Sequence, residues 1–340
     1  METKIFQKNE IKMAADTLRQ NELVAFPTET VYGLGANATS EQAVKKVFAV
    51  KGRPTDNPLI VHVQNFEQVK NYVAQFHPLT PQIVERFWPG PLTLIFKTKP
   101  NAFPSVVSAG LSTVSFRMPN HPLTLALIEA TGVPLVGPSA NTSGRPSPTT
   151  SQHVYHDLQG KIAGILEGGA TEIGVESTVL DLSDSHRAPM ILRPGGVTKE
   201  ELEAALGMDV LVDPHLVSES EAPKSPGMKY QHYAPSTKVL MIGPTDWEEA
   251  LNWAQKQQLK VGLQASPEVV RRFQSQAQAS YCYADNQVAS ATKGLFAGLR
   301  ALDEADLDYI FVATYPETGL GTAYMNRLKK AANQKYFMNN

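Results

Sequence analysis

Short apolar runs of strand length alternate with amphipathic stretches through residues 1–207. The runs are rich in β-branched residues, whereas the stretches between them carry apolar residues three and four positions apart, a spacing typical of helices. Ser40 is a suitable N-cap for one of these helices, and Pro-Gly-Pro at 89–91 ends another. This order predicts an α/β domain built on a mixed, twisted sheet. We expect strands at 23–27, 59–63, 92–97, 113–117, 133–136, 162–166, 177–182 and 190–192, and helices at 40–50, 66–76, 80–88, 122–130 and 198–206.

The character of the sequence changes between residues 208 and 236, where Pro, Ser, Glu and Lys dominate and the periodicity is lost. This composition is typical of a linker. Beyond it, apolar runs again alternate with helical stretches, in the βαβ order of a small doubly wound parallel sheet. We expect strands at 239–242, 260–263, 279–283 and 309–313, and helices at 246–256, 267–276, 286–302 and 323–333. The sequence therefore predicts one domain at 1–207, a linker at 208–236 and a second domain at 237–340.

Charge is balanced in both halves of the chain. The net charge is −2, and residues 1–205 carry 18 basic against 19 acidic side chains, which leaves 13 against 14 for the remainder. Because durable binding to nucleic acid depends on an excess of positive charge, we expect no stable tRNA binding. The hydrophobic content of 42% fits a globular protein, and no apolar run approaches the roughly 20 residues of a membrane helix. We therefore expect no membrane association.

The chain has a single cysteine, Cys282, so no internal disulfide is possible. This fits a protein of the reducing cytoplasm. Cys282 lies in a strand-like run, which predicts a buried structural thiol. No Cys/His cluster has the spacing of a zinc site.

The segment KGRPTDNPLIVH at 51–62 concentrates polar side chains where a helix is expected to give way to a strand. Pro54 and Pro58 restrict the backbone, so we expect Lys51 and Arg53 on a constrained loop, exposed in a cleft. A guanidinium and an ammonium close together suit a polyphosphate. Taken alone, the segment fits a solvated turn equally well, because the helix dipole favours cations at a helix C-terminus.

Four more motifs lie beside strand-like runs: FPTETVYGLG at 26–35, GPSANTSG at 137–144, ESTV at 176–179 and RPGG at 193–196. Two others follow, SPGMKYQHYAP at 225–235 and GLGTAYMNRL at 319–328. In this order the motifs resemble the YrdC family in its two-domain form, the threonylcarbamoyl-AMP synthases, and the resemblance covers the whole chain. It implies a YrdC-like sheet with helices around a concave pocket, followed by a small Rossmann-like domain.

The resemblance implies a reaction that joins L-threonine, bicarbonate or CO2, and ATP into threonylcarbamoyl-AMP and pyrophosphate. Downstream transfer proteins would use this product to make threonylcarbamoyladenosine next to the anticodon of tRNAs. Such phosphoryl chemistry depends on positioning and charge neutralisation and needs no nucleophile from the protein. Accordingly, the sequence has neither a Gly-x-Ser-x-Gly motif nor a P-loop. Mg2+ is expected to arrive with ATP, without dedicated protein ligands, and no organic cofactor is expected.

The resemblance also implies roles for individual residues. Lys51 and Arg53 would be the catalytic pair that contacts the triphosphate. The remaining ATP-binding residues would be Asn57, Thr113, Ser139, Asn141, Arg193 and Tyr233. The L-threonine-binding residues would be Thr30, His62, Arg117 and Ser177. The segment 225–235 would fold over the site as a gate, through Tyr230 and His232. Without the resemblance, His62 fits a core histidine and Arg117 an ordinary charge at a strand end.

Two other functions remain open from the residues alone. A concave, locally positive pocket could hold double-stranded RNA or ribosomal RNA, although the balanced charge disfavours this. A carbamoyl-transfer domain of the kind found in hydrogenase maturation enzymes is the other, although the accompanying pairs of cysteines are absent from the sequence. We expect the second domain to be regulatory or to carry an interaction, with no catalytic residue.

Overall fold

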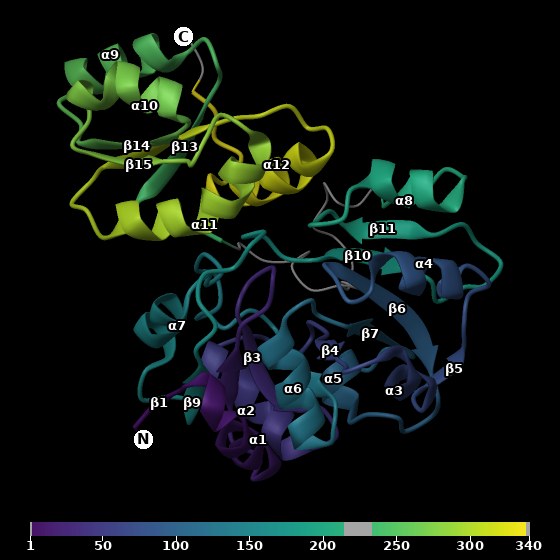
Figure 1. Cartoon of the computed structure of the whole chain (residues 1–340). Helices are drawn as coiled ribbons and strands as arrows, with labels where there is room; N and C mark the ends of the chain where they lie inside the picture. Colours follow the sequence, from purple (N-terminus) through teal and green to yellow (C-terminus); the bar gives the residue numbers. More distant parts are fainter. Residues whose placement is uncertain (1, 214–232, 338–340) are drawn as a thin grey trace. The chain divides into compact units, whose positions relative to one another are not determined.

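The computed structural model describes residues 2–213 and 233–337, and the chain divides into two compact units (Figure 1). The first unit comprises Met1–Ser143, Pro148–Glu172 and Glu176–Tyr230. The second comprises Gly144–Ser147, Ile173–Val175 and Gln231–Asn340. Each unit has its own sheet and its own hydrophobic core. Among the residues described, none of the helices has the length and apolar character needed to span a membrane.

The first unit is built on one long sheet whose strands run both parallel and antiparallel, as the sequence predicts. Along the sheet the strands follow the order β1-β9-β2-β3-β8-β4-β7-β6-β10-β11-β12, and β5 pairs with β6. Their bounds are β1 Lys4–Phe6, β2 Val24–Phe26, β3 Gly33–Asn37, β4 Ile60–His62, β5 Val73–Gln75, β6 Leu92–Thr98, β7 Thr113–Arg117, β8 Leu135–Val136, β9 Gly164–Leu166, β10 Thr178–Asp181, β11 Met190–Arg193 and β12 Leu211–Val212.

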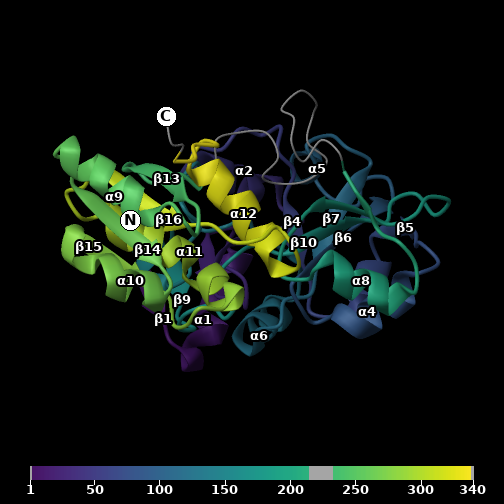
Figure 2. The ribbon, with the colours of Figure 1, turned by 90° about the horizontal axis from the view of Figure 1, so that it is seen from above.

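Helices pack on this sheet through their apolar faces. The two views show α1 beside α6, and α4 beside α8 (Figures 1 and 2). The caps follow the sequence: the side chain of Ser40 accepts a hydrogen bond from the backbone of Ala43, and Thr198 forms a capping box with Glu201. The bounds are η1 Lys8–Glu10, α1 Ile11–Arg19, α2 Glu41–Lys51, α3 Phe66–Lys70, α4 Thr80–Phe87, α5 Ser105–Ser108, α6 Pro122–Thr131, α7 Ser151–Leu158 and α8 Lys199–Leu206.

The central strands bring candidate residues together. β4 and β7 are parallel neighbours, and His62 at the end of β4 lies opposite Arg117 at the end of β7. β8 runs antiparallel on the other side of β4, with Leu135 opposite His62. The loop after β8 therefore passes the imidazole closely, since a Cβ added at Gly137 would lie 2.7 Å from Nδ1 of His62. Only glycine fits there without a shift.

The second unit contains a four-stranded, fully parallel sheet in the order β13-β16-β14-β15, which confirms the predicted doubly wound class. Helices α9 and α10 lie on one face of it, and α11 and α12 on the other (Figure 1). Its elements are β13 Lys238–Ile242, α9 Trp247–Lys256, β14 Val261–Ala265, α10 Pro267–Phe273, η3 Gln274–Gln276, β15 Ala279–Cys282, α11 Val288–Asp303, β16 Tyr309–Ala313 and α12 Leu320–Ala331.

Some local expectations were wrong. The helix expected at 66–76 ends at Lys70, because Val73 enters β5 and pairs with Thr98 of β6. Tertiary pairing outweighs the helical spacing there. The sequence also did not indicate β1, α1, β3, α5, α7 or β12. Strand β3 reads Gly-Leu-Gly-Ala-Asn, a composition disfavoured in strands, but a Cβ at Gly35 would lie 2.5 Å from the carbonyl oxygen of Val24.

Cys282 is exposed, so the expectation of a buried thiol was wrong. It ends β15, an edge strand of the second sheet, and its neighbours Tyr281 and Tyr283 point to the opposite face. Tyr283 is the buried member of this strand end, at 2% exposure. The strand assignment was correct, and the choice of face was not.

Candidate functional site

Lys51 is buried, with 2% of its surface exposed, so the exposure expected for this side chain was wrong. It is the last residue of α2, and Gly52 caps the helix in the left-handed conformation at φ 62°. The ammonium donates to the backbone carbonyl of Ser139, and to that of Asn141 at 2.6 Å. Lys51 thus holds a backbone loop from inside, which a solvated turn would not require.

The loop at 137–143 is fixed along its length by backbone contacts. The amide of Leu34 donates to Pro138 at 2.6 Å, and that of Ala140 donates to Tyr32 at 2.8 Å. Ser143 in turn donates to the carbonyl of Lys51 at 2.9 Å. The structure therefore brings the Lys51 motif and the Ser139–Asn141 motif together, although 88 residues separate Lys51 from Ser139.

Arg53 and Asn57 lie in the turn between α2 and β4. One guanidinium nitrogen of Arg53 donates to the carbonyls of Asn57 and Pro58, at 3.2 and 3.0 Å. Asn57 is 1% exposed, and its side-chain oxygen has no hydrogen-bond partner among the described residues. A buried carbonyl oxygen without a donor is unusual and is a ligand type that Mg2+ accepts. Thr113 begins β7 opposite Lys97, two positions before the residue paired with Ile60, so it lies toward the same end of the sheet as this turn.

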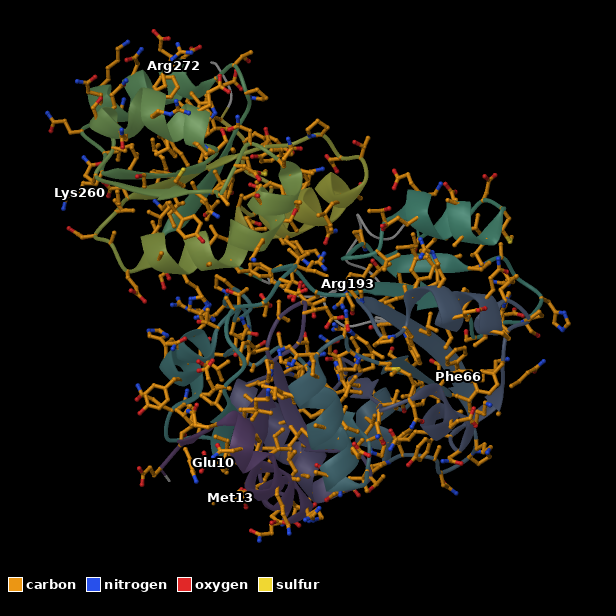
Figure 3. The ribbon with its side chains drawn as sticks, viewed as in Figure 1. Glu10, Met13, Phe66, Arg193, Lys260 and Arg272 are labelled. Atoms are coloured by element: carbon orange, nitrogen blue, oxygen red, sulfur yellow. The ribbon has the colours of Figure 1, made fainter. Side chains whose placement is uncertain are left out.

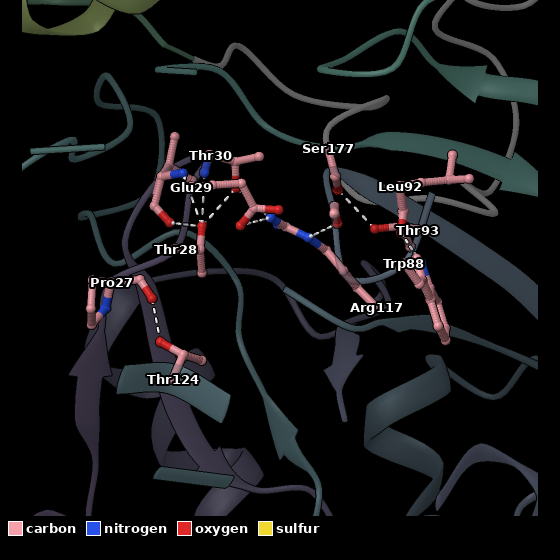
Figure 4. Close-up of polar contacts among 12 residues, drawn as sticks. Pro27, Thr28, Glu29, Thr30, Trp88, Leu92, Thr93, Arg117, Thr124 and Ser177 are labelled. Carbon is pink, nitrogen blue, oxygen red and sulfur yellow. Dashed lines mark hydrogen bonds and ion pairs between the residues drawn. The ribbon is translucent and has the colours of Figure 1, made fainter. Parts of the chain in front are cut away.

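Arg117 is the centre of a second buried group (Figure 4). Its guanidinium donates to the hydroxyl of Thr30 at 2.8 Å and to the carbonyl of Gly90 at 3.2 Å. It also forms an ion pair of 2.7 Å with Glu29, and the two side chains are 5% and 3% exposed. A buried ion pair contributes little net stability, because desolvation offsets the attraction. The ion pair instead holds the guanidinium of Arg117 in one orientation.

His62 is the imidazole of this group, and it is 2% exposed. Burial, and secondarily the charge of Arg117, lowers the pKa of His62 to about 3. The ring is therefore neutral at physiological pH. Its Nδ1 is buried without a hydrogen-bond partner among the described residues, and its edge packs against Phe26 at a centroid distance of 5.3 Å. A neutral imidazole next to a guanidinium can exchange a hydrogen bond with a ligand hydroxyl without adding charge.

Ser177 and Arg193 contact each other directly, although we expected them to bind different substrates. Two guanidinium nitrogens of Arg193 donate to the carbonyl of Ser177, at 3.0 and 2.9 Å, and one also contacts its hydroxyl at 3.2 Å. That hydroxyl lies 2.7 Å from the hydroxyl of Thr93 (Figure 4). Arg193 ends β11 and is 5% exposed (Figure 3). Arg193 therefore orients the segment that presents Ser177.

The predicted gate residues Tyr230 and His232 lie outside the described residues. Tyr233 is described and belongs to the second unit, where its ring stacks on Phe296 at 5.2 Å and lies 5.5 Å from the guanidinium of Arg327. It has a positive φ of 67°, which is uncommon for a tyrosine. That 225–235 acts as a gate stays a prediction.

The sequence analysis did not identify three polar residues of the site: Thr28 and Glu29 in the Arg117 group, and Thr93, which contacts Ser177. Thr28 accepts from the backbone amides of Thr30 and Val31, which shapes the tight turn of this motif. The signal for Glu29 was present, because an acidic residue beside Thr30 in an apolar stretch needs a cationic partner when it is buried. The described residues contain no group of three or more His, Cys, Asp or Glu side chains that could hold a metal ion.

Comparisons with known proteins cover nearly all of the chain. The family model for Sua5, YciO and YrdC proteins, described as "Telomere recombination", matches residues 16–195, and the model "Threonylcarbamoyl-AMP synthase, C-terminal domain" matches 197–333. The chain is 48% identical over 325 residues to the threonylcarbamoyl-AMP synthase of Bacillus subtilis, covering 95% of this chain and 93% of that protein. It is 44% identical over 329 residues to the Pyrococcus abyssi protein of the same name, covering 95% and 94%. A crystal structure of P. abyssi Sua5 complexed with L-threonine matches the fold with a TM-score of 0.91 and 41% identity, over 99% of each chain.

Proposed function

The chain belongs to the threonylcarbamoyl-AMP synthase family, and we propose that its first unit performs the reaction with the residues described above. The enzyme makes threonylcarbamoyl-AMP and pyrophosphate, with L-threonine and ATP as substrates. The observation that supports this best is similarity to named synthases at 44–48% identity over 95% of the chain. The RNA-binding and carbamoyl-transfer alternatives have no comparable support.

We assign the two substrates to two sets of buried side chains, L-threonine to the set around Arg117 and ATP to the set around Lys51. Arg117 would bind the carboxylate of L-threonine, because a guanidinium has more N–H groups than its contacts with Thr30, Gly90 and Glu29 use. The hydroxyls of Thr30 and Ser177 and the neutral ring of His62 would bind the polar groups of the substrate. Such a pocket would distinguish a hydroxyl group from a methyl group on the substrate.

Lys51, Arg53 and the loop with Ser139 and Asn141 would bind the triphosphate. In the reaction, threonine nitrogen bonds to the carbon of CO2 and loses a proton, which gives a carbamate. A carbamate oxygen then attacks the α-phosphorus of ATP, and the bond from that phosphorus to the bridging oxygen breaks as pyrophosphate leaves. Lys51 and Arg53 would neutralise charge on the phosphates during this step. No covalent intermediate with the protein is required.

Mg2+ would enter with ATP, and the side-chain oxygen of Asn57 is the group best suited to contact it. Bicarbonate or CO2 would be the third substrate. The product would pass to proteins that transfer threonylcarbamoyl to tRNA, and the enzyme would work in the cytoplasm without stable tRNA binding of its own. Thr113, Arg193 and Tyr233 complete the proposed ATP contacts.

Pyrophosphate release tests this proposal. With ATP, Mg2+ and bicarbonate, the enzyme should release pyrophosphate only when L-threonine is added. Arg117→Met should raise the KM for threonine and leave the Kd for ATP within about twofold, since the guanidinium would contact the amino acid and not the nucleotide. Pyrophosphate release that ignores threonine, or an Arg117→Met variant that loses ATP binding instead, would contradict the assignment.

A further inference from the structure

Two short segments from the first half of the chain belong to the second unit. They are Gly144–Ser147 and Ile173–Val175. The first begins three residues after Asn141, and the second ends two residues before Ser177. Each is therefore continuous with one of the proposed substrate-binding positions, one for ATP and the other for threonine.

The segment 144–147 is held by charge-assisted hydrogen bonds to helix α11. Arg300 is 8% exposed and donates through two nitrogens to the carbonyl of Pro146, at 3.2 and 2.6 Å. Asp303, whose side chain is 6% exposed, forms an ion pair with Arg145 at 3.2 Å and accepts from the amide of Thr237 at 2.7 Å. The amide of Ala234 donates to the carbonyl of Gly144 at 2.9 Å. Buried guanidinium–carbonyl bonds of this kind fix a backbone in place.

The segment 173–175 is held by packing on the same helix. Gly174 has a φ of 83°, and a Cβ there would lie 2.4 Å from the carbonyl oxygen and 2.6 Å from the Cα of Lys293 in α11. No side chain can be accommodated without moving backbone. Val175 next to it is fully buried. Lys293 and Arg300 are seven positions apart in α11, about two helical turns, so one helix contacts both segments.

We propose that α11 is a positioning element for catalysis: Arg300 and Asp303 set the loop that carries Asn141, and the close packing of Gly174 on Lys293 sets the approach to Ser177. None of these residues touches substrate in this proposal, which rests on the function proposed above. The physical reason is that misplacing a binding group by about 1 Å costs on the order of a hundredfold in rate. The second unit would then act by fixing the geometry of two loops.

The test compares Arg300→Met and Gly174→Ala in the full chain, with KM measured separately for ATP and for L-threonine. Arg300→Met should raise the KM for ATP about tenfold or more while the KM for threonine stays within about twofold. Gly174→Ala should do the reverse. Arg300→Lys, which keeps one donor to Pro146, should recover part of the loss.

Two variants supply matched controls. Gly207→Ala has a similar positive φ of 65° but no atom within 4 Å of the added Cβ, and Arg272→Met removes an exposed guanidinium from the second unit. Both should keep wild-type KM values. Where Arg300→Met does not fold, Asp303→Asn takes its place. Wild-type KM values in the folded variants, or equal losses for both substrates, would overturn the proposal. A wild-type chain that makes no threonylcarbamoyl-AMP would instead refute the proposed function.

Discussion

Replacing Lys51 with methionine should reduce both stability and ATP use. The substitution keeps the apolar stem and removes the ammonium that donates to the carbonyls of Ser139 and Asn141. A hydrogen bond to a charged group contributes about 1.5–3 kcal/mol, and burying the ammonium costs part of that gain. We therefore expect the free energy of unfolding to fall by about 2–4 kcal/mol. For a domain of about 200 residues this lowers Tm by about 5–15 °C.

The assay combines thermal unfolding with the KM for ATP. Lys45→Met is the control, because Lys45 lies on the same helix with 64% of its side chain exposed and pairs only weakly with Glu41 at the surface. That control should change stability by less than about 0.5 kcal/mol. A Lys51→Met variant with wild-type Tm would show that the ammonium does not fix the loop. A lowered Tm with an unchanged KM for ATP would show that Lys51 stabilises the fold but does not contribute to ATP binding.

Three further predictions follow from the Arg117 group. Glu29→Gln should lower the free energy of unfolding by about 3–5 kcal/mol and raise the KM for threonine, since it leaves the buried guanidinium of Arg117 uncompensated; urea unfolding that matches wild type would contradict this. L-Valine should support far less pyrophosphate release than L-threonine, because a site built around Thr30, Ser177 and His62 leaves polar groups unpaired with valine; comparable rates would exclude such a pocket. Acid should destabilise the fold through His62. The unfolded chain binds the extra proton between about pH 6.5 and 3, so stability is retained above that window and lost as pH falls through it. His62→Gln should remove up to about 1.4 kcal/mol per pH unit of that loss, as followed by unfolding at pH 7, 6 and 5.

Most of the fold could be predicted because the buried residues recur along the sequence with the spacing typical of the helix or strand that they form. In the second unit, alternating strands and helices gave the correct class and every element there except η3, since a parallel sheet covered on both faces leaves a clear pattern. Strand β3 could not be predicted, because its glycines are required by close contact with Val24 and Phe26 in the paired strand β2. The local sequence of β3 does not contain this contact. The burial of Cys282 was predicted wrongly for a similar reason. The sequence does not show that β15 lies at an edge of the sheet, where one face of the strand is exposed.

Motifs proposed the candidate site residues, but they could not indicate the contacts around them. Lys51 was placed at the right helix end, but its burial depends on a loop 88 residues away, which no local pattern contains. Glu29 was overlooked because its partner Arg117 follows it by a similar distance in the chain. Arg193 and Ser177 were assigned to different substrates, whereas the pairing of β10 with β11 puts them in contact.

Identifying the product of the reaction is the decisive test of the proposed synthase activity. The full chain would be incubated with ATP, Mg2+, L-threonine and isotopically labelled bicarbonate, and the products separated and weighed by mass spectrometry. We expect threonylcarbamoyl-AMP that carries the label in its carbamoyl carbon, formed together with pyrophosphate and lost when any one substrate is omitted. An unlabelled adenylate, or ATP turnover without threonylcarbamoyl-AMP, would refute the proposed reaction.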